Sequence, residues 1–166
     1  MPRLRRIVMS LLALGVLLPL LVLVAAQFGA FAGSTPTDLG VKDGRLKPPS
    51  RTPNSVTSQA GLHAGHPMAQ RAAIAPLAYS GDGRAAMRKL ATVLQGLERT
   101  TLIRQEPDYL YAQCRSELMR FTDDVEFWLD EKAGVIHVRS ASRIGHGDRG
   151  VNRARIEMIR HQFMAS

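Results

Sequence analysis

The chain has 166 residues, 45% of them hydrophobic, and its 22 Lys+Arg against 14 Asp+Glu give a net charge of +8 at pH 7. This length accommodates one domain with accessory segments. Three of the basic residues precede an apolar run, so 19 remain against 14 acids from residue 37 onward, without the basic stripe of a nucleic-acid-binding protein. The single cysteine, Cys114, excludes an intrachain disulfide and a cysteine metal cluster.

The N-terminal 32 residues contain a 20-residue stretch, Ile7 to Ala26, that carries no charge. This length matches the hydrocarbon core of a bilayer. Because Arg3, Arg5 and Arg6 precede it, the positive-inside bias keeps the N-terminus in the cytoplasm and exports the rest, to the periplasm or an equivalent side. We predict a retained membrane anchor. The alternative is a cleaved signal peptide, since residues 30–32 read Ala-Phe-Ala.

Residues 33–70 are rich in Pro, Gly, Ser and Thr and have no sustained apolar period. Such a composition does not bury enough surface to fold alone, so we predict an extended tether or a segment laid over the domain. His63 and His66 form an H-x-x-H pair without a third ligand, and we predict no metal site. The domain itself is expected to occupy residues 71–166.

The clearest helix is predicted over residues 84–99, where Met87, Leu90, Leu94 and Leu97 form one apolar stripe. Asp82 is placed to cap its start. Apolar alternation with a period of two then predicts strands over residues 101–104, 108–118, 123–130 and 135–142. The connections are short, which favours antiparallel hairpins.

A closing amphipathic helix is predicted over residues 152–163, with Ile156, Ile159 and Phe163 directed inward. The expected fold is therefore α+β, with a small antiparallel sheet of three to four strands packed with two helices. One face of the sheet should meet the helices. The other face, carrying Glu126, Trp128 and Arg139, is expected to be exposed.

The segment from residue 139 to residue 157 is the candidate binding site, because it combines arginines and hydroxyl residues with a glycine-punctuated turn. Asn152 is a suitable cap for the last helix, whose N-terminus favours an anion. Guanidinium groups provide bidentate donors to phosphate or carboxylate. The predicted ligand-binding residues are Arg139, Ser140, Ser142, Arg143, Asp148, Asn152 and Arg153.

A competing interpretation makes these arginines structural partners of the strand carboxylates. Asp124 and Glu126 share one strand face and can pair across the sheet with Arg115, Arg139 or Arg143. If the segment does bind a ligand, Asp124, Glu126 and Arg115 would be supporting residues that orient its arginines. A hydrolase using Asp124 with Glu126, or Ser142 with His146, is the alternative from another class, although no nucleophile elbow marks the sequence.

Three blocks, TPNSVTSQA, FTDDVEFWLD and VIHVRSASRIGHGDRGVNRARIEMIR, resemble the domain-of-unknown-function family 1499 over roughly residues 39–163. The resemblance implies an envelope or plastid setting and no established reaction, ligand or cofactor. Members often carry two cysteines where this chain has Pro49 and Ser55. Loss of both fits a dispensable disulfide in an oxidising compartment and argues against thiol or metal chemistry there.

Together these patterns predict a membrane-anchored envelope protein that binds an anionic ligand or a lipid headgroup, and they favour a binding protein over an enzyme. No cofactor, no metal and no nucleic-acid partner are expected. A structural role beside another envelope protein is the remaining alternative.

Overall fold

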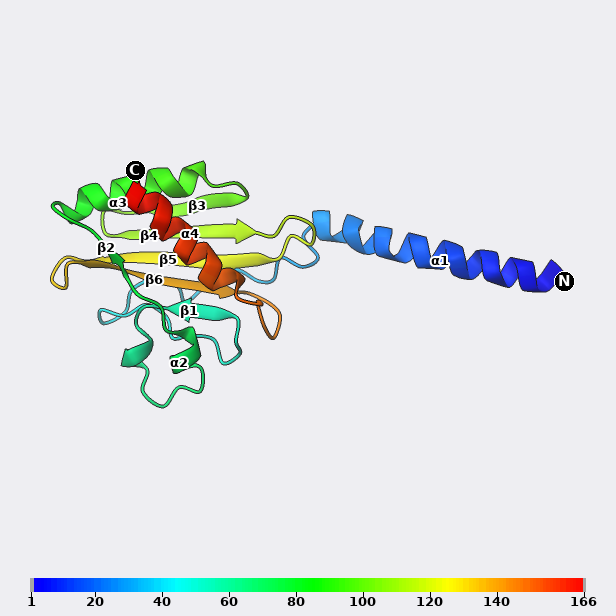
Figure 1. Ribbon diagram of the computed structural model, residues 1–166, viewed down its shortest axis with the longest axis horizontal. Helices are drawn as coiled ribbons and strands as arrows, with labels where there is room; N and C mark the ends of the chain where they lie inside the picture. Colours follow the sequence, from blue (N-terminus) through cyan, green and yellow to red (C-terminus); the bar gives the residue numbers. More distant parts are fainter. Residues whose placement is uncertain (1, 166) are drawn as a thin grey trace.

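The computed structural model describes residues 2–165, which form a long N-terminal helix and an α+β domain (Figure 1). The helix projects away from one end of the domain. The elements in chain order are α1 (Pro2–Gln27), β1 (Ser55–Thr57), the short 3-10 helix η1 (Ala60–Leu62), α2 (Ala69–Ala72), β2 (Leu77–Ala78), α3 (Gly83–Gly96), β3 (Thr100–Gln105), β4 (Tyr109–Arg115), β5 (Thr122–Asp130), β6 (Val135–Ser142) and α4 (Val151–Ala165).

The sheet is antiparallel and has six strands in the order β1-β6-β5-β4-β3, with β2 also paired to β6. The predicted size of three to four strands was therefore too small. The two additional strands are only three and two residues long, too short to show an alternating pattern. Both pair with the outer edge of β6, β1 opposite Arg139–Ala141 and β2 opposite Val135 and Ile136.

One face of the sheet packs against α3 and α4, and together they form the main hydrophobic core. Leu90 and Leu94 of α3, Ile156 of α4 and Phe127 of β5 are all fully or almost fully buried in it. Asp82 caps α3 as predicted, because its carboxylate accepts a hydrogen bond from the Arg84 N–H at 2.9 Å. Cys114, the single cysteine, is buried in the same core.

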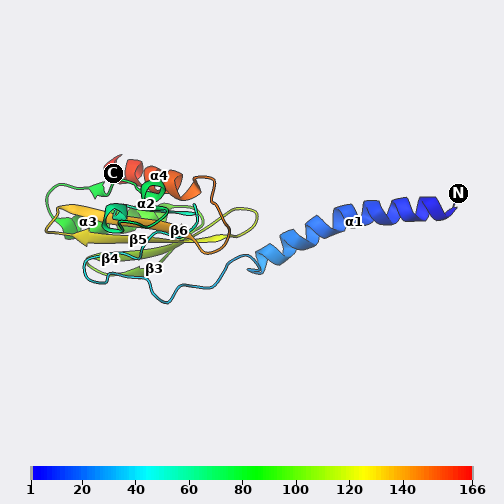
Figure 2. The same cartoon turned by 90° about the horizontal axis from the view of Figure 1, so that it is seen from below.

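The opposite face of the sheet is covered by the segment that follows α1 (Figure 2). Leu46 of this segment is buried against Tyr109 and Tyr111, with Leu39 and Val41 packed beside them. The prediction of an exposed second face was wrong, since Glu126 is 0% and Arg139 4% exposed. Residues 33–70, predicted as an extended tether or a segment laid over the domain, include a layer on the sheet and the strand β1.

Helix α1 is long and apolar enough over Arg3–Gln27 to cross a membrane, and among residues 2–165 it is the one helix with this property. Its side chains from Leu4 to Val24 are exposed. This is compatible with a membrane anchor or with a signal sequence, as both share this length and composition.

Candidate functional site

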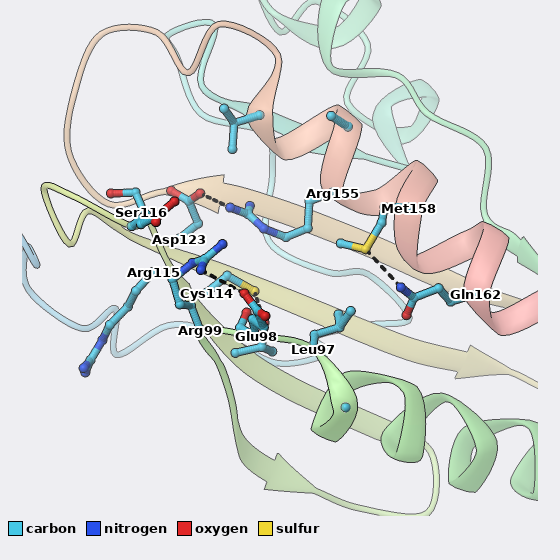
Figure 3. A pocket seen from close by; sticks show the side chains of 15 residues that line it. Leu97, Glu98, Arg99, Cys114, Arg115, Ser116, Asp123, Arg155, Met158 and Gln162 are labelled. Atoms are coloured by element: carbon cyan, nitrogen blue, oxygen red, sulfur yellow. Dashed lines mark hydrogen bonds and ion pairs between the residues drawn. The ribbon is translucent and has the colours of Figure 1, made fainter.

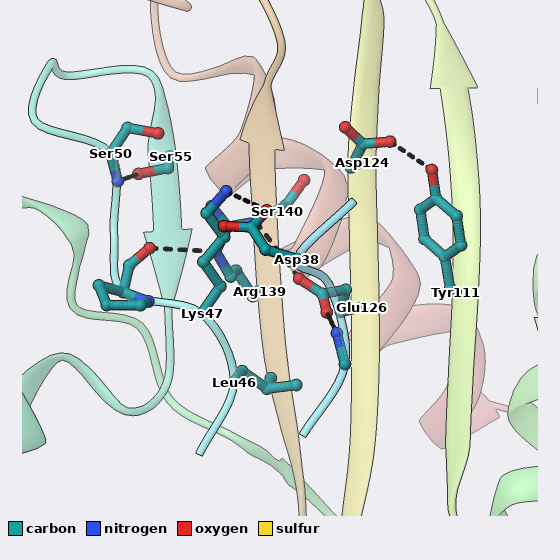
Figure 4. Close-up of polar contacts among 12 residues, drawn as sticks. Asp38, Leu46, Lys47, Ser50, Ser55, Tyr111, Asp124, Glu126, Arg139 and Ser140 are labelled. Atoms are coloured by element: carbon teal, nitrogen blue, oxygen red, sulfur yellow. Dashed lines mark hydrogen bonds and ion pairs between the residues drawn. The ribbon is translucent and has the colours of Figure 1, made fainter. Parts of the chain in front are cut away.

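The covered face of the sheet contains a buried ion pair between neighbouring strands. Glu126 of β5 lies directly opposite Arg139 of β6, and an Arg139 Nη1 donates to Glu126 Oε2 at 3.3 Å. The other oxygen of Glu126 accepts hydrogen bonds from the Tyr109 hydroxyl and from the Gly40 N–H, both at 2.8 Å. Arg139 also donates to the carbonyl of Pro48 (Figure 4). Both charged groups therefore have internal partners supplied partly by the covering segment.

A second ion pair lies on the same face, nearer the end of the sheet from which α1 leaves. Arg143 forms a forked contact with Asp124, through Nε at 2.9 Å and Nη2 at 2.8 Å. The Tyr111 hydroxyl donates to Asp124 at 2.6 Å (Figure 4). Hydrogen bonding to Asp124 raises the pKa of Arg143, and burial raises the pKa of the Tyr111 hydroxyl. The arrangement is charge-assisted and bidentate, which is the strong geometry for such a pair.

Another carboxylate of β5, that of Asp123, points to the helix face and pairs with Arg155 of α4 at 2.6 Å. Arg155 also donates to Asn152 Oδ1 at 2.8 Å and to Ser140 Oγ at 3.2 Å. The Ser140 hydroxyl donates to Asn152 Oδ1. Ser140, Asn152 and Arg155 thus join β6 to α4 by one polar network.

The glycine-rich turn before α4 is closed by Asp148. Its carboxylate accepts from the backbone N–H groups of Gly150 and Asn152 at 3.0 and 2.9 Å and from the Asn152 amide at 2.9 Å. Burial opposes the charge of Asp148, but these donors hold its pKa below the usual range. Asn152 was predicted as the cap. It lies instead inside the helix, fully buried, and Asp148 accepts the first N–H groups.

The remaining arginines of α4 hold the segment that leads into β2. Arg153 donates to the carbonyls of Arg71 and Ala73 at 2.9 and 2.8 Å, and Arg160 donates to those of Ala75 and Pro76. Arg115 is different. It is exposed at the end of β4, and within residues 2–165 it forms no ion pair and no side-chain hydrogen bond.

The residues of the hydrolase alternative do not form a catalytic arrangement among the described residues. Ser142 accepts a hydrogen bond from the Asn152 amide at 3.0 Å, while His146 is exposed and makes no side-chain hydrogen bond there. Asp124 and Glu126 lie side by side on β5, but each is buried and paired with its own arginine. Neither pair presents a free base to a solvent-accessible substrate site.

An open cleft of about 660 Å³ lies on the helix face, between the C-terminal end of α3, the first turns of α4 and the adjoining ends of β3 and β4 (Figure 3). Its apolar lining comes from Leu97, Cys114, Val151 and Met158. Burial raises the pKa of the Cys114 thiol, which therefore stays protonated. The volume is in the range of sites for small organic ligands.

The charged residues of this cleft are three arginines and three acids: Arg99, Arg115, Arg155, Glu98, Glu117 and Asp123. Arg99 pairs with Glu98 at 3.0 Å and Arg155 with Asp123, so Arg115 is the arginine without an acidic partner. From the sequence, Arg115 was predicted only as a supporting residue, and the cleft was not predicted. The spacing of Val151, Ala154, Met158 and Gln162 along α4 is a second helical stripe that indicates it.

Comparison with known protein families gives a match over most of the domain. The family model described as "Protein of unknown function (DUF1499)" covers residues 45–163, well over half of the chain. No curated protein and no solved structure matches the chain.

Proposed function

Because the chain belongs to the DUF1499 family, a family defined without a reaction, we propose a function from its own geometry: the domain binds a small anionic ligand with an apolar portion in the cleft between α3 and α4. The observation that carries this proposal is an apolar floor with the Arg155 guanidinium in the wall beside it (Figure 3). Arg115 belongs to the rim: it is exposed, has no acidic partner among residues 2–165, and its side chain is directed away from the floor in Figure 3, so it contacts a ligand only by turning toward the cleft. A phosphate or carboxylate is the natural acceptor for its fork of donors.

The other predicted ligand-binding residues would act behind the cleft. Ser140 and Asn152 hold Arg155 in the cleft wall, and Asp148 fixes the start of α4. Arg139 and Arg143 are already paired with Glu126 and Asp124, so they maintain the sheet instead of contacting the ligand. This moves the proposed contact from the predicted set between Arg139 and Arg153 to Arg155 in the cleft wall and Arg115 at its rim.

The position of the cleft supports a lipid headgroup as the anion. Arg115, Ser116 and Glu117 line the cleft and run directly into the turn that contacts the end of α1. If α1 is a retained anchor with its N-terminus in the cytoplasm, the domain lies on the exported side and the cleft is close to the bilayer. An anionic headgroup with the first part of its acyl chains would match the charged rim and apolar floor.

The test is a binding titration on the full chain in neutral detergent, followed by NMR of methyl-labelled methionines. Met158 lines the cleft and should shift on adding short-chain phosphatidylglycerol. Short-chain phosphatidylcholine tests the need for net charge, and inorganic phosphate tests whether the anion alone is sufficient. Saturable shifts with phosphatidylglycerol support the lipid headgroup. Equal shifts with inorganic phosphate identify a free anion, and no shift with any probe contradicts the proposal.

Matched variants locate the binding. Arg115→Gln should weaken affinity about tenfold, since a hydrogen bond to a charged group contributes about 1.5–3 kcal/mol. Arg51→Gln removes the same charge from an exposed position outside the cleft and should leave affinity unchanged. Ala154→Phe fills the cleft without removing a charge and should also abolish binding. If Arg115→Gln and Arg51→Gln weaken the affinity equally, the effect comes from the net charge of the protein and not from the position of Arg115.

A further inference from the structure

The end of α1 is attached to the domain without a linker. The apolar run ends at Ala26, which is fully buried. The next residue, Gln27, donates to the carbonyl of Leu118 at 3.1 Å and accepts from Arg120 Nε at 3.0 Å. The rings of Phe31 and Phe121 pack with centroids 5.6 Å apart. The turn between β4 and β5, residues 116–121, is therefore held against the last turn of α1 (Figure 1).

Large apolar side chains are exposed around this attachment point. Phe28 is 87% exposed, Leu118 68%, Ile144 38% and Phe121 37%. They come from three segments: the residues after α1, the β4–β5 turn and the loop after β6. The first and third segments meet at Gly33, where an added Cβ would lie only 2.8 Å from Arg143 Cβ and 2.9 Å from Ile144 Cγ2. Single exposed apolar residues are ordinary, but a group gathered at one end marks an interaction surface.

The position of this group relative to α1 identifies its partner. A bilayer has a hydrocarbon core about 30 Å thick and a total thickness of about 40–45 Å, which leaves roughly 5–8 Å of headgroup layer on each side. Since Gln27 follows the apolar run directly and contacts Leu118 and Arg120, the turn lies within that layer if α1 spans the bilayer. Apolar and aromatic side chains are stable at this depth, and arginine is attracted to lipid phosphates.

We propose that Phe28, Leu118, Phe121 and Ile144 form a membrane-inserted tip, which sits in the headgroup layer of the bilayer spanned by α1 and fixes the orientation of the domain. Arg120 adds a phosphate contact at its edge. The tip uses none of the cleft residues, so it stands independently of ligand binding. Its consequence for the cleft is geometric: Arg115 to Glu117, which precede Leu118, are held next to the headgroups.

The proposal is tested by the depth of a nitroxide label on the full chain, reconstituted in vesicles of phosphatidylcholine and phosphatidylglycerol. The label is attached at Leu118→Cys, in a Cys114→Ala background that removes the native thiol. The control label is at Ala133→Cys, an exposed position in the β5–β6 turn at the opposite end of the sheet. The label at position 118 should collide several-fold more with oxygen and several-fold less with a water-soluble nickel complex than the control label.

A second variant separates insertion of the tip from simple tethering by α1. Phe28→Ser, Phe121→Ser and Ile144→Ser are combined in the chain labelled at position 118, and circular dichroism confirms that the fold is intact. The label should then move into water, with a several-fold gain in nickel collisions. An unchanged label depth in this triple variant would overturn the proposal, as would equal nickel access at positions 118 and 133. A mature chain lacking residues 1–32 would overturn it as well.

Discussion

The side chains on the two faces of strand β5 are buried in two different environments. On the helix face, Val125, Phe127 and Leu129 are buried in an apolar core. On the other face, Asp124 and Glu126 are equally inaccessible, but their charges are matched by arginines, tyrosine hydroxyls and the backbone N–H of Gly40. Apolar burial stabilises a fold nearly independently of which neighbour provides it, whereas a buried charge is tolerated only with its particular partners. The contrast predicts different responses to mutation on each face.

The largest effect is expected from Glu126→Ala, which leaves the Arg139 guanidinium buried without its carboxylate. Breaking a buried pair from one side costs about 3–5 kcal/mol. Replacing both residues, Glu126→Leu with Arg139→Met, should recover most of this loss. Urea unfolding of the full chain in neutral detergent measures both. If the double variant is as unstable as Glu126→Ala, the loss of stability does not come from leaving the Arg139 charge buried without its partner.

On the helix face, Leu90→Ala should destabilise the domain by about 3 kcal/mol through lost apolar contact and a cavity. Leu90 is fully buried in the α3–sheet core. No single charge change elsewhere should rescue it, in contrast to the opposite face. The same urea measurement applies, and a loss well below 1 kcal/mol would show that this core collapses around the cavity.

A smaller effect is expected at Asp123, whose pair with Arg155 lies at the cleft and is partly solvated, with side chains 9% and 12% exposed. Asp123→Asn should cost about 1–2 kcal/mol, because an amide oxygen retains one acceptor. It should also strengthen phosphatidylglycerol binding, since Arg155 gains free donors. Weaker binding with the fold intact would place the ligand away from Arg155.

The smallest effect is a dependence of stability on pH through His137, which stacks on Trp128 on the covered face. Burial lowers the pKa of His137, although Asp130, 3.7 Å away, opposes this. The folded state therefore binds the proton less readily than the unfolded state. The free energy of unfolding should therefore be highest above the ordinary histidine pKa of about 6.5. It should decrease as the pH falls from there toward the pKa of His137 in the folded state. Unfolding curves between about pH 7.5 and about pH 5 check this, and His137→Gln should flatten the trend.

Much of this fold follows from local patterns. The period-two alternation correctly separated Asp124 and Glu126 from Val125 and Phe127, and the apolar stripe located α3. The strands β1 and β2 were missed because they are too short for a pattern and exist only through pairing with β6. The buried second face was missed for a related reason: Leu46 and its neighbours cover it from a segment whose composition resembles a linker.

The candidate site shows the same limit. Sequence spacing identified the arginines of residues 139–155 and proposed carboxylates as their partners, and the structure shows those pairs for Arg139 and Arg143. Long-range contacts decide which arginine of the cleft has no acidic partner among the described residues. Arg155 meets Asp123 from 32 residues away, and Arg115 is left at the rim of a cleft lined by α3, β3, β4, β5 and α4.

The most direct test of the central claim is native mass spectrometry of the full chain, extracted from membranes in neutral detergent, beside Ala154→Phe. The wild-type protein should retain a lipid-sized mass with an anionic headgroup, and the variant, folded but with its cleft filled, should lose it. A wild-type chain that carries no bound lipid, or a variant that retains it fully, would contradict the assignment of the cleft between α3 and α4 as the binding site.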